Sequence, residues 1–115
     1  MKKLLLLPLL LLLSCGPVEQ SVRDSIAASK GVLVTAQVKY HDSCVANPIQ
    51  QPCVVINKVV DVQHVVKDAF YIYCSFVPTD TPDKKCVPVK SALPTLQAAI
   101  ANLNQTTADL KGLLK

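Results

Sequence analysis

The feature that most constrains the fold is an apolar repeat between Pro52 and Ser75 that contains no glycine or proline. Its apolar residues recur at steps of four, three, four, three and four, the spacing of one face of an α-helix. They are Val55, Val59, Val62, Val66, Ala69 and Tyr73. The many valines favour a strand, but the polar residues of the segment also recur at three and four rather than two. We therefore predict a helix over residues 53–74, with two short strands as the alternative.

Two further stretches repeat this spacing, one on each side of the first. The earlier one predicts a helix over residues 21–41, with Ser21 as its N-cap, and its apolar face consists of Val22, Ile26, Ser29, Leu33, Ala36 and Tyr40. The later one predicts a helix over residues 92–114, with the face Leu93, Leu96, Ile100, Leu103, Thr107, Leu110 and Leu114. Polar, proline-bearing segments separate the three. The expected fold is all-α, a small antiparallel three-helix bundle with up-down-up topology.

The N-terminal segment has the composition of an export signal. Met1, Lys2 and Lys3 precede ten apolar residues, all leucine except Pro8. As a helix this run is about 15 Å long, half of the ~30 Å needed to span a bilayer. It is therefore predicted to be the apolar core of a signal peptide rather than a membrane anchor.

The residues that follow, Leu12-Leu13-Ser14-Cys15, have an aliphatic side chain at −3, a small one at −1 and then a cysteine. This pattern resembles the lipobox of bacterial lipoproteins. The resemblance implies that residues 1–14 are removed, that Cys15 carries a diacylglycerol and an N-acyl chain, and that residues 15–20 form a tether. Gly16 stands where inner-membrane lipoproteins of enteric bacteria carry an aspartate, which favours the outer membrane. The alternative is an ordinary signal peptide with an incidental cysteine.

The remaining four cysteines are an even number in a chain expected to meet an oxidising compartment, so two disulfides are predicted. Cys53 and Cys74 stand at opposite ends of the central predicted helix, about 31 Å apart, whereas a disulfide requires Cα atoms within about 7 Å. The predicted pairs are therefore Cys44 with Cys53 and Cys74 with Cys86. Each is expected to lie in an inter-helix loop and to staple one end of the bundle.

Charge and motifs exclude several classes of function. The formal charge of the whole chain is +4, and the predicted signal contributes two of its lysines, so no nucleic-acid partner is expected. His41, Asp42 and Ser43 are adjacent and cannot assemble a catalytic triad. No spacing typical of a metal site or of a cofactor appears. We therefore expect no enzymatic activity, no metal and no cofactor other than the lipid on Cys15.

One helical face carries the residues singled out as a possible partner surface, Asp61, His64, Asp68 and Tyr71. Two carboxylates beside an imidazole can bind a divalent metal weakly or sense pH. The alternative is a solvated face with ordinary helix ion pairs. Val32, Val34 and Val38 lie off the apolar face of their helix. They form either an apolar patch for a partner or second copy, or a surface covered by the third helix.

These observations predict a non-catalytic, membrane-anchored envelope module that acts in protein interaction or structural support. The alternative is an envelope inhibitor, or a phage or plasmid exclusion lipoprotein, that blocks an incoming factor. The expected partners are the membrane and an envelope protein.

Overall fold

The computed structural model describes residues 18–115, and all of its regular structure in that range is helical. The elements are α2 (Val18–Ala46), α3 (Gln51–Cys74), a short 3-10 helix η1 (Lys90–Ala92) and α4 (Leu93–Leu113). The prediction of an all-α fold with three long helices is confirmed, and the strand alternative for the valine-rich segment is wrong. The predicted signal peptide and Cys15 lie outside the described residues.

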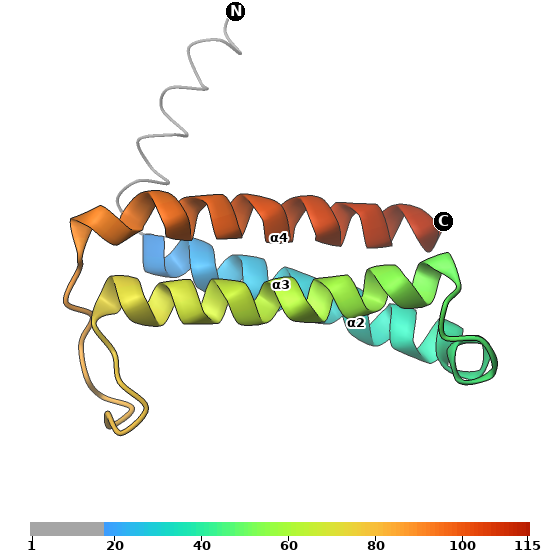
Figure 1. Ribbon diagram of the computed structural model, residues 1–115, viewed down its shortest axis with the longest axis horizontal. Coiled ribbons are helices and arrows are strands. Elements are labelled where there is room, and N and C mark those ends of the chain that lie inside the picture. The colour runs from blue at the N-terminus through green and yellow to red at the C-terminus, as the bar shows by residue number, and fades with distance from the viewer. Residues whose placement is uncertain (1–17) are drawn as a thin grey trace, which may run out of the picture.

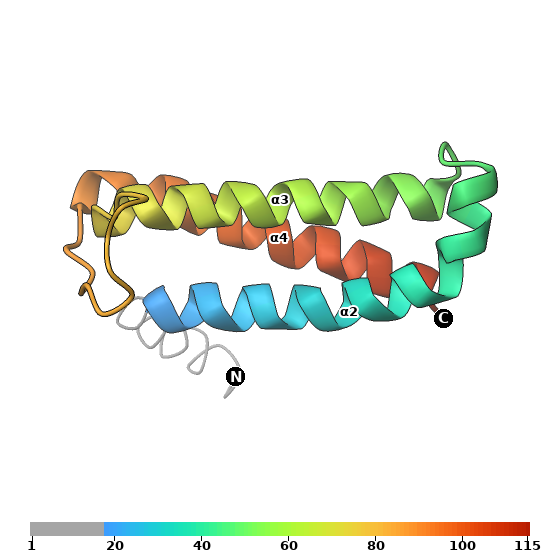
Figure 2. The same ribbon diagram turned by 90° about the horizontal axis from the view of Figure 1, so that it is seen from below.

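The three long helices lie side by side, and α3 runs opposite to α2 and α4 (Figures 1 and 2). The bundle therefore has two distinct ends. At the loop end α2 begins, α3 ends and α4 begins, and residues 75–89 form the long connection. At the turn end α2 ends, α3 begins and α4 ends, and residues 47–50 connect α2 to α3. Among residues 18–115, no helix has the length and apolar character required to cross a membrane.

The buried faces of α2 and α3 follow the predicted spacing. Val22, Ser29, Leu33 and Ala36 are buried on α2, and the α3 core includes Val59, Val62, Val66, Ala69 and Tyr73. On α4 the face is rotated, because Leu96, Ala99, Leu103, Thr106 and Leu110 are buried, whereas Thr107 is only half-buried. The hydroxyl of Thr106 donates to the Asn102 carbonyl at 2.7 Å, which satisfies it inside the core.

One polar contact crosses the core between α2 and α3. The side-chain amide of Gln63 donates to the Ser29 hydroxyl oxygen at 2.6 Å, and that hydroxyl donates to the Ile26 carbonyl at 2.8 Å. Both side chains are buried. The contact satisfies these groups and fixes the register of α2 against α3.

The first helix is longer at both ends than the sequence predicts. It begins at Val18 rather than residue 21, because Val18 is itself part of the buried face. Ser21 is therefore inside the helix and is not its N-cap, and residues 18–20 are not tether. The helix continues past its predicted end at residue 41 to Ala46, so Cys44 belongs to it rather than to a loop. It stops where Asn47 precedes Pro48, a position that disfavours helical backbone.

Both predicted disulfides are present. The Cα atoms of Cys44 and Cys53 lie 5.6 Å apart, and those of Cys74 and Cys86 lie 4.4 Å apart. Their placement differs from the prediction, because only Cys86 lies in a loop. The other three cysteines are in the terminal turns of α2 and α3, so each disulfide begins on a rigid helix end.

The C-terminal end of α4 is held by side chains of α2. The Tyr40 hydroxyl donates to the Leu113 carbonyl at 2.9 Å, and Lys39 Nζ donates to the Leu114 carbonyl at 3.3 Å. The last carbonyls of a helix lack intrahelical partners, and a cation there also complements the helix dipole. These two bonds join α4 to α2 at the turn end.

Candidate functional site

The predicted partner surface on α3 is exposed, but its members do not act on one another. Three of its members are exposed, namely Asp61, His64 and Asp68. Their side chains form no hydrogen bond or ion pair with any residue between 18 and 115. The structure therefore supplies neither the ordinary helix ion pairs nor a geometry that holds a metal there. Tyr71 is 49% exposed and belongs to a different neighbourhood, at the loop end.

Aromatic rings gather where α3 ends. Phe76 lies edge-on to Phe70 with ring centroids 5.9 Å apart, and edge-on to Tyr71 with centroids 5.8 Å apart. Such T-shaped pairs are favoured by the ring quadrupoles. They fix the first loop residues against the last turn of α3. They also give this end of the bundle an apolar surface.

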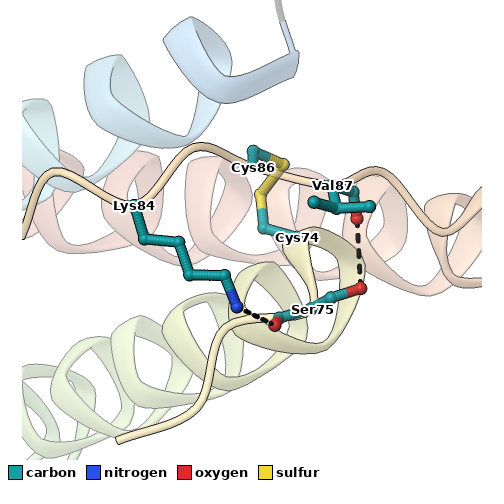
Figure 3. The surroundings of a disulfide bond; sticks show 5 residues. All are labelled: Cys74, Ser75, Lys84, Cys86 and Val87. Carbon is teal, nitrogen blue, oxygen red and sulfur yellow. Dashed lines mark hydrogen bonds between the residues drawn. A yellow bond between two sulfur atoms is a disulfide. The ribbon is translucent and has the colours of Figure 1, made fainter. Parts of the chain in front are cut away.

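Ser75 turns the chain out of α3. Its backbone is left-handed, with φ of 60° and ψ of 30°, and the Phe76 N–H reaches back to the Tyr71 carbonyl at 2.9 Å. This is a Schellman-type helix end, a position that usually carries glycine. A serine is useful here because its hydroxyl donates to the Val87 carbonyl at 3.1 Å (Figure 3).

The long loop is anchored to α3 at several further points. The disulfide from Cys74 to Cys86 lies beside the Ser75 turn, and Lys84 Nζ donates to the Ser75 carbonyl at 3.3 Å (Figure 3). The Val87 N–H donates to the Cys74 carbonyl at 3.0 Å, and the Val89 N–H donates to the Tyr73 carbonyl at 2.7 Å. Residues 75–89 therefore form an ordered platform at the loop end.

The tip of the loop is organised by carboxylates. The Val77 N–H donates to Asp80 at 2.7 Å, and Lys84 Nζ lies 3.1 Å from the same carboxylate. The backbone hydrogen bond, followed by the lysine, lowers the pKa of Asp80 below its ordinary value of 3.8. A hydrogen bond from the Thr81 side chain likewise lowers the pKa of Asp83.

Between this platform and the start of α2 lies a cavity of about 530 Å³, which we call the loop-end groove. Phe70, Phe76, Pro82 and Cys86 supply its apolar walls, and Glu19, Arg23, Lys84 and Lys85 supply its charged ones. Three cations thus face one carboxylate. A second cavity of about 600 Å³ continues it past Tyr71 and shares Phe70, Phe76, Pro82 and Lys84.

Glu19 also belongs to the one group of potential metal ligands that lie close together in the described part of the chain. Its carboxylate and the sulfur atoms of Cys74 and Cys86 lie within 4.8 Å of one another. Both sulfur atoms belong to the disulfide, and metals bind thiolates rather than disulfides. The cluster is not a metal site while the disulfide is formed.

The turn end has a different character, because several of its most exposed side chains are apolar. Val38, Val45 and Ile49 are 78%, 73% and 82% exposed. A smaller cavity of about 280 Å³ lies beside them, lined by Tyr40, His41, Val45, Pro48, Ile56 and the disulfide between Cys44 and Cys53, with Gln37 and Asn57 at its polar edge. Val38, Val45 and Ile49 together with this cavity are here called the turn-end patch.

Part of this surface was expected from the sequence. Val34 and Val38 are exposed, so the third helix does not cover them, whereas Val32 is half-buried against the core. Val45 and Ile49 were not predicted to belong to this surface, because the sequence around them predicts a polar loop. The loop-end groove was also missed, since it joins Glu19 and Arg23 to residues about sixty positions later in the chain. In the sequence, only the two adjacent lysines Lys84 and Lys85 pointed to a charged site in this loop.

No protein-family model, curated protein or solved structure matches the chain.

Proposed function

We propose that the protein is an envelope lipoprotein, anchored to a membrane through lipid on Cys15, whose bundle binds another envelope protein without catalysing a reaction. The supporting observation is the cysteine arrangement. Cys44, Cys53, Cys74 and Cys86 are all consumed by disulfides, so Cys15 is the one cysteine of the chain left for lipid. It ends a lipobox-like sequence three residues before α2 begins.

The anchor is tested by the intact mass of the protein extracted from membranes, measured before and after reduction. The expected mass is that of residues 15–115 plus acyl chains, rising by four hydrogens when the two disulfides are reduced. A Cys15→Ser variant is expected to lose the acyl mass and to leave the membrane fraction. Retention of residues 1–14, or an unacylated mature chain, contradicts the proposal.

The proposed docking surface is the turn-end patch. Ile49, Val38 and Val45 are the most exposed large apolar side chains of residues 18–115, and they lie beside a cavity, which supports a contact site at this end. The occupant that fits is an apolar side chain of a partner protein, inserted between α2 and the start of α3. Gln37, His41 and Asn57 at the edge of the cavity then supply the polar rim, as interfaces usually combine an apolar centre with a polar edge.

Docking is tested by placing a photo-crosslinking residue at position 45 in the anchored protein. A single discrete adduct is expected in cells, and it should be lost when Ile49→Asp is added. Val65→Asp is the matched control, because Val65 is also exposed but lies elsewhere, on α3. Equal loss of the adduct with both variants, or no adduct at position 45 but one at position 65, contradicts docking at the turn end. An adduct that contains only a phage or plasmid protein identifies the exclusion alternative.

A further inference from the structure

The loop end of the bundle is tied closely to the proposed anchor. Helix α2 begins at Val18, three residues after Cys15. Three residues of extended chain span at most about 11 Å. If Cys15 carries the lipid, as proposed above and on which this inference rests, the start of α2 must lie within that distance of the membrane surface.

The loop-end groove opens beside this point, and its charges do not balance. Of the groove's three cations, Lys84 is held by Asp80. Arg23 and Lys85 form no ion pair with any residue between 18 and 115. Glu19 is the one carboxylate in its wall. A guanidinium and an ammonium in a concave site are suited to a phosphate, which an arginine binds with two parallel hydrogen bonds.

The remaining surface around the groove is amphipathic. Phe70 and Phe76 line it, and Tyr71 exposes about half of its surface next to them. Val77, at the start of the loop, is also half exposed. Aromatic residues that combine an apolar ring with a polar group are enriched at the interface between membrane and water. Cations and aromatic side chains thus meet at the end of the molecule nearest the proposed anchor.

We propose that the loop-end groove binds the phosphate group of an anionic phospholipid in the membrane that carries the anchor. Arg23 and Lys85 bind the phosphate, and Phe70, Phe76 and Tyr71 contact the glycerol region and the upper acyl chain. This contact sets the orientation of the bundle on the membrane. Each cation near an anionic surface strengthens such a contact by about fivefold.

The chain contains no tryptophan, so a single introduced tryptophan reports on one place. The acylated mature protein carrying Tyr71→Trp is reconstituted into vesicles that contain brominated phosphatidylcholine, with or without phosphatidylglycerol. Quenching by the brominated lipid is expected to rise when phosphatidylglycerol is present and to fall at high salt. A Val77→Trp protein provides a second reporter, and an Ile49→Trp protein at the turn end should respond to neither condition.

Adding Arg23→Gln and Lys85→Gln should weaken the phosphatidylglycerol-dependent contact by about 25-fold. The matched control is Lys58→Gln with Lys67→Gln, which removes the same charge from exposed positions on α3. The control should leave the quenching unchanged. If both pairs reduce it equally, attraction depends on net charge alone and the groove proposal is wrong.

The remaining outcomes separate the groove from the anchor. Protein that does not sediment with phosphatidylcholine vesicles is not anchored, which overturns the proposed function together with this inference. Protein that sediments, but shows no phosphatidylglycerol dependence at either reporter, overturns the groove alone. A tryptophan signal that responds equally to inorganic phosphate without vesicles assigns the site to free phosphate instead of a lipid.

Discussion

The two ends of the bundle are built on the same plan but present different chemistry. Each is closed by one disulfide that starts on a helix end. At the loop end the connection spans residues 75–89 and is ordered by hydrogen bonds, an ion pair and edge-on aromatic pairs. At the turn end the connection spans residues 47–50, and the nearby surface exposes the apolar side chains of Val38, Val45 and Ile49. The disulfides thus fix the architecture, and the connecting segments decide what each end can contact.

The hydrophobic core of the bundle extends to both ends. Leu96 lies near the loop end and Leu110 near the turn end of α4, and both are fully buried. Leu96→Ala and Leu110→Ala should each lower the free energy of unfolding by about 2–5 kcal/mol, since each leaves a cavity in a packed core. Urea denaturation measures both. A loss below about 1 kcal/mol for Leu110→Ala alone would mean that the turn end is frayed.

The disulfides should contribute almost equally to stability despite the different ends. Their sequence separations are 9 and 12, for which loop-closure entropy gives about 2.5–3 kcal/mol each. Cys44→Ser with Cys53→Ser, and Cys74→Ser with Cys86→Ser, are compared by urea denaturation under non-reducing conditions.

Hydrogen exchange should nevertheless distinguish the two pairs. Only the second pair should expose the amides of Val87 and Val89, which bond to the last residues of α3. Protection of these amides in both variants contradicts the view that the disulfide orders the loop.

A smaller effect is expected at the helix end that starts the long loop. Ser75→Gly relieves left-handed strain worth about 1 kcal/mol but removes the hydrogen bond to Val87, also worth about 1 kcal/mol. The net change in unfolding free energy should lie within about 0.5 kcal/mol. A clear stabilisation would show that the serine hydroxyl contributes nothing to the loop.

The smallest effect concerns the loop tip at low pH. Because the folded state lowers the pKa of Asp80, the ionised carboxylate stabilises the loop above 3.8, and this contribution is lost as pH falls through the lower folded value. Exchange protection of the Val77 amide should therefore decline in acid. In Asp80→Asn it should be weaker at neutral pH and nearly independent of pH. An identical acid profile in the variant assigns the effect to another group.

Periodicity was enough to predict the helices and, through the length of the central one, the pairing of the cysteines. A 22-residue helix keeps Cys53 and Cys74 far apart whatever else the chain does. Helix ends were less predictable, because burial of Val18 extends α2 beyond the apparent cap at Ser21.

The two candidate binding surfaces could not be predicted in full from the spacing of residues along the chain. The loop-end groove exists because α2 begins where α3 ends, which places Arg23 and Lys85 in the walls of the same cavity. Spacing rules describe residues within a helix, whereas this contact depends on how helices are arranged. Ile49 at the turn end was not predicted for a related reason, since it contributes to a surface without contributing to any helix face.

The unbroken length of α2 gives the anchored protein a defined reach. Its 29 residues correspond to about 43 Å, and the connection to Cys15 adds no more than about 11 Å. An upright bundle therefore holds the turn-end patch roughly 50 Å from the membrane, and a tilted one holds it closer. A partner must present its contact within that height, so lipid bound at the loop end, by fixing the tilt, also selects which proteins the opposite end can meet.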